Sequence, residues 1–218
     1  MFESPLFQQV RDAVIEAACP KVDDNAVDLG AGTGFLSLEL APMVAGLIAV
    51  DLSEAMIEML QSEARQRDID NVDARVADLS TLDLPPASVD LIVSNYALHH
   101  LTDTDKAALI VRAHRWLRPG GRLVIADMMF GRGFTPQDRK IIVTKIKGLL
   151  AKGPGGLLRV VKNLFRFGLR RGTELPATPD FWVRTAEAAG FGSVRYRSIV
   201  AEAGLLTAVA TGPRRDDA

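Results

Sequence analysis

The sequence predicts a single α/β domain in which helices cover both faces of a mostly parallel sheet. Short apolar runs alternate with segments of helical periodicity over most of the 218 residues. The apolar runs, such as GLIAVD at 46–51 and VDLIVS at 89–94, are continuous rather than alternating, which is typical of strands buried on both faces. With 48% hydrophobic residues, a chain of this length can bury one substantial core.

Five strands are expected within the first 130 residues, with helices between them. The strands span residues 26–29, 46–51, 72–77, 89–94 and 122–127. One helix is expected to run from Ser53, a residue type that caps helices well, to Gln66. Its apolar residues recur at helical spacing and are expected to form one face from Met56, Met59 and Leu60.

A second helix is expected from Asp105 to Leu117, where apolar residues again recur every three or four positions. Its buried face would consist of Leu109, Ile110, Ala113, Trp116 and Leu117. The run Pro119-Gly120-Gly121 is expected to end this helix, because proline and glycine both break helices. The predicted order is completed by a helix over 179–189 and by strands over 193–200 and 205–211.

Composition excludes several classes of protein. The mean hydropathy of +0.12 and ordinary glycine and proline contents exclude a disordered or collagen-like chain. No run approaches the roughly 18 apolar residues that span a bilayer, and the first 20 residues do not read as a secretory signal. The single cysteine, Cys19, excludes an intramolecular disulfide. We therefore expect a cytoplasmic location.

The stretch AVDLGAGTGFLSLELA at 26–41 is the most informative part of the sequence. A predicted strand leads to Asp28 and then to three glycines, Gly30, Gly32 and Gly34, which allow a ligand to lie against the backbone. A dinucleotide-binding turn has the spacing G-x-G-x-x-G, but Phe35 stands at its third glycine position. The Asp28 carboxylate would repel a pyrophosphate and suits a ligand with an ammonium group. The turn therefore favours a ligand other than NAD.

This sequence resembles the class I S-adenosylmethionine-dependent methyltransferases, in particular those that act on small molecules. The run from Asp28 through Ala31 to Gly34 matches the first motif of the family. The resemblance covers residues 22–130 and the closing segment from Pro179. It implies a Rossmann-like sheet of seven strands whose last strand is antiparallel. It also implies S-adenosylmethionine as the cofactor and S-adenosylhomocysteine as its product.

Two further acids match the family in order and spacing. The resemblance implies that Asp51, with Leu52 beside it, binds both ribose hydroxyls, since one carboxylate can accept from two adjacent donors. It also implies that Asp78, with Leu79 beside it, accepts from the adenine amino group. Structural alternatives remain open. Asp51 could cap a helix, Asp78 could be an ordinary loop carboxylate, and Asp28 could order the glycine turn.

The segment after the fourth strand is expected to surround the transferred methyl group. Ser94 and Asn95 match the strand end that lines the methionine part of the cofactor in the family. His99 and His100 follow, and imidazole is the commonest general base. In similar sequences one such histidine acts as base with help from an acid at the end of strand five, here Asp127. We expect His99 to be the base; alternatively, both histidines cap a helix or shape the pocket.

Missing motifs narrow the acceptor. The run Ser94-Asn95-Tyr96-Ala97 lacks the prolines of DNA amino-methyltransferases, and Cys19 lies too early in the chain to be the nucleophile of a cytosine-C5 enzyme. No acidic or Cys/His pattern indicates a metal site. We therefore expect methyl transfer to oxygen or carbon of a small-molecule or lipid-like acceptor, with neither a metal nor a DNA partner.

A strongly basic stretch follows the fifth strand. Residues 131–172 hold eleven lysines and arginines against one acid, Asp138, whereas the rest of the chain holds 15 basic and 26 acidic residues. A helix over 157–170 would place its basic side chains in one stripe opposite an apolar face. The stripe consists of Arg159, Lys162, Arg166 and Arg170. We expect a helical lid that is either solvated on its basic side or in contact with an anionic membrane through residues 139–171. The scarcity of aromatic residues in it disfavours RNA.

The predicted layout is one domain over residues 1–218. It consists of an N-terminal helix over 1–20, a cofactor-binding core over 22–130, a basic lid over 131–175 and a closing segment over 176–212. The predicted activity is methyl transfer from S-adenosylmethionine. Two alternatives remain open, an NAD-dependent oxidoreductase and a cofactor-binding module without catalysis. The sequence does not indicate an oligomeric state.

Overall fold

A computed structural model of the protein describes residues 5–130, 175–200 and 203–212, which contain one seven-stranded sheet. The strand order is β3-β2-β1-β4-β5-β7-β6. The strands from β3 to β5 pair in parallel, and β7 is antiparallel to both of its neighbours. The predicted mostly parallel sheet with an antiparallel last strand is therefore confirmed.

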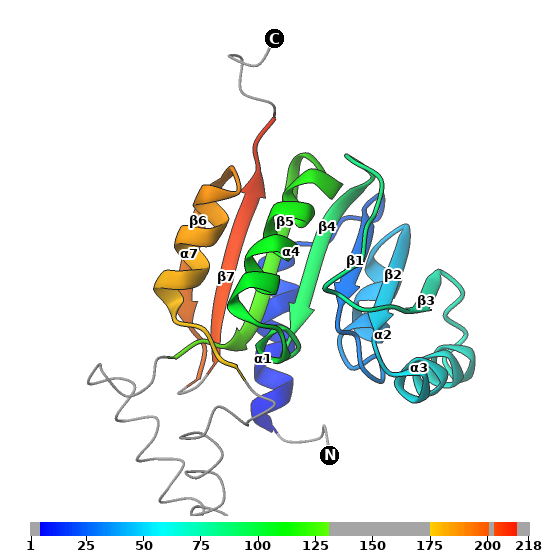
Figure 1. Cartoon of the computed structure of the whole chain (residues 1–218). Coiled ribbons are helices and arrows are strands. Elements are labelled where there is room, and N and C mark those ends of the chain that lie inside the picture. Colours follow the sequence, from blue (N-terminus) through cyan, green and yellow to red (C-terminus); the bar gives the residue numbers. More distant parts are fainter. Residues whose placement is uncertain (1–4, 131–174, 201–202, 213–218) are drawn as a thin grey trace, which may run out of the picture.

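The bounds of the elements follow the predicted order. The strands are β1 (Asn25–Leu29), β2 (Gly46–Asp51), β3 (Val72–Val76), β4 (Val89–Asn95), β5 (Leu117–Met128), β6 (Phe191–Ser198) and β7 (Ala203–Ala210). The helices are α1 (Pro5–Ala18), α2 (Ser37–Leu40), α3 (Glu54–Gln66), α4 (Asp103–Trp116) and α7 (Pro179–Ala188), with 3-10 turns η1 (Ala41–Met43) and η2 (Leu98–His100). The carboxyl ends of β1 and β4 lie at the lower end of the sheet in Figure 1, where α1 begins.

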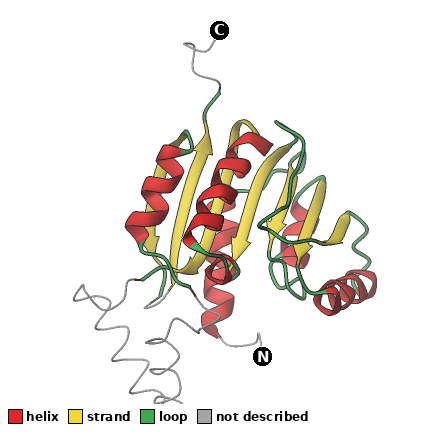
Figure 2. Cartoon of the chain, in the orientation of Figure 1, coloured by secondary structure: helices red, strands yellow, loops and turns green. Residues whose placement is uncertain are grey.

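Helices cover both faces of the sheet, as Figure 2 shows. One core lies between the sheet and the helices α4 and α7 and contains the buried indoles of Trp116 and Trp182. The other core lies against α1 and α2 and contains Val10, Val14 and Leu40. Burial of the central strands on both faces explains why β4 and β5 read as continuous apolar runs.

The helix α3 is capped by Ser53 as predicted, but its predicted apolar face is wrong in part. Leu60 is buried, together with Ile57 and Ala64. Met56 and Met59, in contrast, are exposed. The reason is the position of the sheet, because Leu60 packs against Ala49 of β2 and this contact selects the face that α3 buries.

The helix α4 buries the four predicted side chains from Leu109 to Trp116, but it ends before the Pro119-Gly120-Gly121 run. Leu117 is already part of β5 and pairs with Val89, and regular pairing resumes between Arg122 and Leu91. The proline and glycines therefore form an irregularity within β5, where Gly120 has a φ of 82°. They do not end the helix.

The remaining differences between the predicted and the observed elements involve only a few residues each. The helix after the glycine loop, α2, has only four residues, because the chain turns into η1 at Ala41 and Pro42. Strands β6 and β7 each begin two residues earlier than predicted. Gly190, with a φ of 98°, follows α7 and leads directly into β6. Cys19 is exposed just past the end of α1 rather than on the helix itself.

The predicted basic lid over 131–175 and its arginine and lysine stripe lie outside the described residues, apart from Leu175. The division of the chain into the predicted segments therefore stays a prediction. In the part of the chain that the structure describes, no helix has the length and apolar character needed to cross a bilayer.

Candidate active site at the carboxyl edge of the sheet

The glycine loop connects β1 to α2 and is held against β2. The backbone N–H groups of Gly30 and Ala31 both donate to the carbonyl of Val50, at 2.8 and 2.9 Å. The three glycines have φ angles of 79°, 54° and 89°, a region that side chains disfavour. The sequence motif is therefore required by the backbone conformation of the loop.

The three glycines differ in what surrounds them. A Cβ atom at Gly30 would lie 2.2 Å from the Cβ of Ala97, and one at Gly34 would lie 2.9 Å from side-chain atoms of Leu38 and Leu60. A Cβ atom at Gly32 would meet nothing within 4 Å. Packing thus requires Gly30 and Gly34, whereas Gly32 leaves the loop backbone open to a ligand.

Asp51, the last residue of β2, joins the glycine loop to α3. Its Oδ2 accepts from the backbone N–H of Gly32 at 2.8 Å, and its Oδ1 accepts from that of Ser53 at 2.9 Å. Each carboxylate oxygen has a further lone pair, and the residue is partly exposed. Ser53, not Asp51, caps α3, so the helix-cap alternative for Asp51 is wrong. The carboxylate is available to a pair of hydroxyl donors.

Asp78 follows β3 at a strand end beside that of β2, because the N–H of Ala77 donates to the Asp51 carbonyl at 2.9 Å. Asp78 is exposed and accepts from the N–H of Ser80 at 2.8 Å, a bond that lowers the pKa of this carboxyl. Leu52 is 69% exposed next to Asp51. Two carboxylates and an exposed apolar side chain thus lie along the β2 and β3 ends.

Asp28 is buried under the glycine loop and differs from the other acids. Its Oδ2 accepts from the hydroxyl of Ser37 at 2.6 Å, and its Oδ1 has no hydrogen-bond partner among the described residues. Burial raises the pKa of Asp28 to about 7. Ser37 was not among the predicted site residues, although a polar side chain between Leu36 and Leu38 indicated a buried hydrogen bond.

Ser94 and Asn95 end β4 and have different surroundings. Ser94 is wholly buried, and its hydroxyl donates to the carbonyl of Leu29 at 2.7 Å, which ties β4 to β1. Asn95 is half-buried, and its Oδ1 lacks a hydrogen-bond partner among the described residues. Asp28 and Asn95 therefore each present an unpaired buried acceptor on neighbouring strands.

The structure brings His99 and Asp127 together in a buried pair. Nδ1 of His99 lies 2.6 Å from Oδ1 of Asp127, and the backbone N–H of His99 donates to Oδ2 at 2.9 Å. The two residues are 6% and 1% exposed. In the tautomer whose Nδ1–H donates to this carboxylate, Nε2 carries the free lone pair of the ring. His100 is exposed, and its ring lies 4.2 Å from that of His99.

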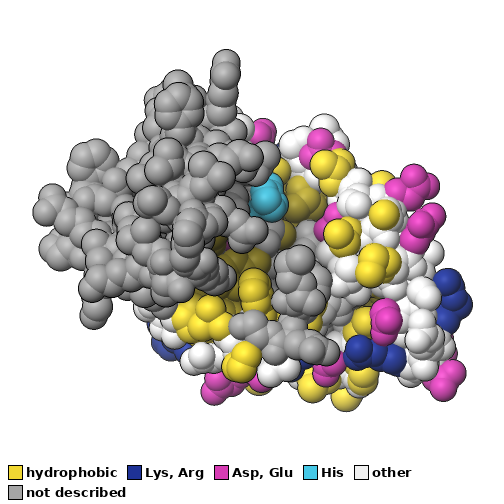
Figure 3. Space-filling model, turned by 90° about the horizontal axis from the view of Figure 1, so that it is seen from below, with side chains coloured by type: hydrophobic (Ala, Val, Ile, Leu, Met, Phe, Trp, Pro, Cys, Tyr) yellow, Lys and Arg dark blue, Asp and Glu magenta, His cyan; other side chains and the backbone are white. Residues whose placement is uncertain are grey.

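Apolar side chains lie beside this pair. Tyr96, which has a positive φ of 53°, lies between β4 and His99, and its ring centroid is 5.3 Å from that of Phe7 in α1. It also packs against the buried Met128 and Phe130 at the end of β5. Seen from the lower end, the described surface shows several hydrophobic side chains and one histidine (Figure 3).

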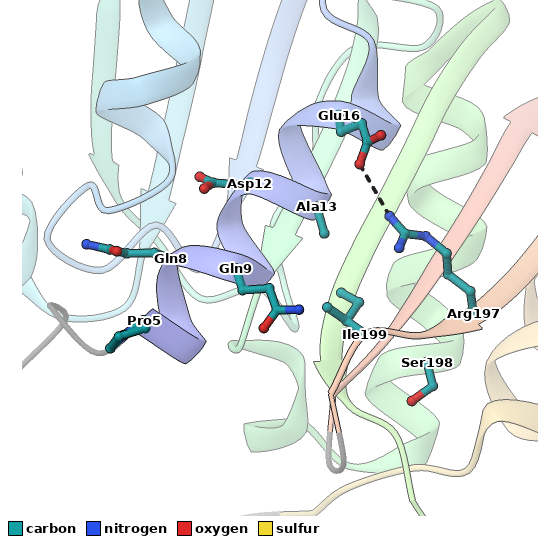
Figure 4. Close-up of a pocket in the computed structure, with 9 residues that line it drawn as sticks. All are labelled: Pro5, Gln8, Gln9, Asp12, Ala13, Glu16, Arg197, Ser198 and Ile199. Carbon is teal, nitrogen blue, oxygen red and sulfur yellow. Dashed lines mark ion pairs between the residues drawn. The ribbon is translucent and has the colours of Figure 1, made fainter.

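A pocket of about 660 Å³ lies elsewhere, between α1 and the end of β6. Glu16 and Arg197 point toward each other across it, 3.8 Å apart and both exposed (Figure 4). A second hollow of about 630 Å³ over β5, β7 and β6 shares Arg197. None of the described residues that line them belongs to the glycine loop or the histidine pair. An exposed ion pair holds its two side chains only weakly in place. We therefore assign the chemistry to the edge of the sheet formed by the carboxyl ends of the parallel strands.

Comparisons with known proteins find similarity to methyltransferases. A family described as a methyltransferase domain matches residues 26–121. An uncharacterized methyltransferase from Bacillus subtilis is 32% identical over 125 residues, which are 57% of this chain and 47% of the relative. A demethylmenaquinone methyltransferase from Mycobacterium sp. (strain KMS) is 30% identical over 193 residues, which are 88% of this chain and 77% of the relative.

The chain spans about half the length of the first three curated relatives that it matches. Among solved structures, the crystal structure of a Bacillus subtilis protein has a TM-score of 0.69 and covers 94% of this chain and 100% of its own. The two sequences are 17% identical in that superposition, so this likeness concerns the fold.

The different surroundings of Gly30 and Gly32 predict different defects. Gly30→Ala should lower the free energy of unfolding by roughly 3 kcal/mol, because it adds a clash with Ala97 to the backbone strain. Gly32→Ala should cost only the strain, roughly 1–2 kcal/mol, and should mainly weaken binding of S-adenosylhomocysteine. Urea unfolding and titration calorimetry measure the two effects. A larger loss of stability in Gly32→Ala would contradict this assignment.

Asp28 should make the fold less stable as pH rises. Because its folded pKa of about 7 exceeds the unfolded value of 3.8, the folded protein keeps a proton that the unfolded chain loses between these values. The contribution of Asp28 to the free energy of unfolding should therefore fall by roughly 3–4 kcal/mol between pH 4 and 7.

Urea unfolding of the wild type and of Asp28→Asn at several pH values isolates this contribution, since the amide does not titrate. Relative to wild type, Asp28→Asn should gain stability as pH rises. Asp12→Asn, on the exposed side of α1, serves as the control. Parallel pH profiles for the wild type and Asp28→Asn would show that Asp28 titrates normally.

Proposed function

The chain belongs to the class I S-adenosylmethionine-dependent methyltransferases, and we propose that it transfers the methyl group to oxygen or carbon of a small, lipid-like acceptor. The observation that carries the proposal is the buried His99–Asp127 pair, which lies at the same sheet edge as the glycine loop. A proton acceptor and a cofactor loop at one edge are what methyl transfer to a hydroxyl or an acidic carbon requires.

The residues at this edge fit S-adenosylmethionine. Asp51 has free lone pairs for the ribose hydroxyls, and the open backbone at Gly32 leaves space beside it. Asp78 is exposed at the neighbouring strand end, where it would accept from the adenine amino group. The unpaired oxygens of Asp28 and Asn95 suit the ammonium group of the methionine part. When bound, the cofactor supplies an electrophilic methyl group on a sulfonium.

His99 is suited to remove the acceptor proton. Its Nδ1–H is held by Asp127, so the ring orientation and tautomer are fixed and Nε2 is the remaining basic atom. The Asp127 carboxylate would stabilise the imidazolium that forms, in a buried site where such an interaction is strong. The chain thus contributes a positioned base and alignment, the two things an in-line displacement needs from a protein.

The surroundings of the pair support an apolar acceptor. The rings of Phe7 and Tyr96 pack against each other, and Tyr96 also packs against the buried Met128 and Phe130, so apolar side chains flank the chain segments that carry His99 and Asp127. Apolar walls with few polar groups are typical of sites for small hydrophobic ligands. The name of the mycobacterial relative, demethylmenaquinone methyltransferase, supports a quinone-like acceptor.

The cytoplasmic location and the membrane contact through residues 139–171 stay predictions. Support for the membrane contact is the net charge of +10 over residues 131–172, which would attract anionic lipid. The NAD-dependent alternative is disfavoured by Phe35 at the third glycine position and by the buried acid Asp28 behind the loop.

Ligand binding tests the choice of cofactor. S-adenosylhomocysteine at 100 times its Kd should stabilise the protein by about 2.7 kcal/mol, and NADH should have no effect. Asp51→Ala should remove most of this shift, because bonds to a charged acceptor are worth roughly 1.5–3 kcal/mol. Asp51→Asn, which keeps an acceptor oxygen, should retain part of it. Thermal unfolding with each ligand gives the result, and stabilisation by NADH alone would contradict the assignment.

Removal of the imidazole tests the base. His99→Ala should lower the methylation rate by about 10²- to 10⁴-fold while the affinity for S-adenosylhomocysteine stays within about threefold. His114→Ala, which removes a histidine packed against Phe191, is the matched control. A loss below tenfold would reduce His99 to a pocket-lining residue. If His100→Ala were the damaging change, the neighbouring histidine would be the base.

A further inference from the structure

Lys106 is a wholly buried lysine in α4, outside the groups that the proposed reaction uses. Its Nζ donates to the carbonyl of Leu175 at 2.5 Å and to Oδ1 of Asp103 at 3.0 Å. Asp103 itself is 67% exposed, so the ammonium is paired with a carboxylate that remains in water. Burial of an ammonium group is costly, and this site offers it one neutral and one charged partner.

Filling the core does not by itself account for a lysine at this position. Lys106 lies three residues before Leu109 and four before Ile110, on the face of α4 that packs against the core. An apolar side chain of the same length would fill this space without the desolvation of a charge. It could not, however, donate a hydrogen bond to the carbonyl of Leu175. With an apolar residue at position 106, this carbonyl would lose its buried partner.

Leu175 connects the lysine to His99. The backbone N–H of Leu175 donates to the carbonyl of His99 at 2.6 Å. The backbone of His99 is therefore held on both sides, through its N–H by Asp127 and through its carbonyl by Leu175. The Lys106 ammonium donates to the carbonyl of Leu175 in turn, so two hydrogen bonds through the backbone of Leu175 link α4 to the backbone of His99.

The turn that carries His99 needs such support. It is a 3-10 turn of three residues, Leu98–His100, without a side-chain cap at its start. Among the described residues, the backbone hydrogen bonds within the turn run from the N–H of His100 to the carbonyl of Ala97 at 3.3 Å and from the N–H of Leu101 to the carbonyl of Leu98 at 3.0 Å. A shift of about 1 Å in a reacting group can cost 10²-fold in rate, so the position of this turn matters for a general base.

We propose that Lys106 is a positioning residue that sets the place of His99 through the backbone of Leu175, without touching cofactor or acceptor. The proposal rests on the proposed role of His99 as base. It predicts that removal of the ammonium lowers turnover by disturbing His99, and that the cofactor site at the β1 and β2 ends is unaffected.

The variant that tests this is Lys106→Met, which keeps the length of the side chain and removes its donors. The turnover number should fall by about 10- to 100-fold, whereas the Kd of S-adenosylhomocysteine should stay within about twofold. Lys106→Arg, which keeps charge and donors, should recover part of the rate. Asp103→Asn, which leaves the core filled, should lower the turnover number in the same way but by less. It replaces Lys106→Met as the test variant if Lys106→Met does not fold.

The double variant separates positioning from a general loss of stability. If Lys106 acts through His99, Lys106→Met should cause no further loss of rate in a His99→Ala background. Additive losses would overturn the proposal. So would a Lys106→Met protein with a lowered unfolding midpoint but unchanged turnover.

A second measurement does not depend on activity. In protein labelled with ¹⁵N-histidine, the hydrogen-bonded Nδ1–H of His99 should give a slowly exchanging proton signal, assigned by its loss in His99→Ala. Lys106→Met should shift or broaden this signal, and unchanged signals would overturn the proposal. If the wild type binds S-adenosylhomocysteine but methylates nothing, the proposed function fails, and the histidine signals still decide the role of Lys106.

Discussion

Parallel pairing of β1 with β2 and β4 is the constraint on which the site depends. It places the ends of these strands at one edge, so that Asp28, Asp51 and Asn95 become neighbours although they are far apart in the sequence. The Asp51 carboxylate then fixes the glycine loop relative to α3 by accepting one backbone N–H from each. The same pairing continues through β4 to β5 and brings Asp127 next to His99. The glycine loop and the His99–Asp127 pair are thus positioned by one sheet.

The acids at this edge have different surroundings and therefore different chemistry. Asp28 is buried with one hydroxyl donor, and burial raises its pKa to about 7. Asp78 is exposed, and the N–H of Ser80 lowers its pKa. Asp51 accepts two backbone bonds and keeps lone pairs for further donors. The three carboxyl groups therefore differ: Asp28 is buried and has a raised pKa, Asp78 lies in water and has a lowered pKa, and Asp51 is bonded to the loop.

Local sequence patterns predicted the order of strands and helices and the Ser53 cap of α3, because each depends on neighbours in the chain. They failed where tertiary contacts decide. The sheet selected Ile57 and Leu60 rather than Met56 and Met59 as the buried face of α3, and pairing with β4 drew Leu117 into β5. The hydrogen-bond partners of Ser37 and Lys106 lie nine and 69 residues away, and the local sequence identifies neither partner.

The most direct test of the central claim is a crystal structure of the protein with bound S-adenosylhomocysteine. Both ribose hydroxyls should donate to the Asp51 carboxylate, the chain of the ligand should pass over Gly32, and the sulfur should lie on the side of His99. A ligand seated in the groove between α1 and β6, or one whose ribose lies away from Asp51, would contradict the account.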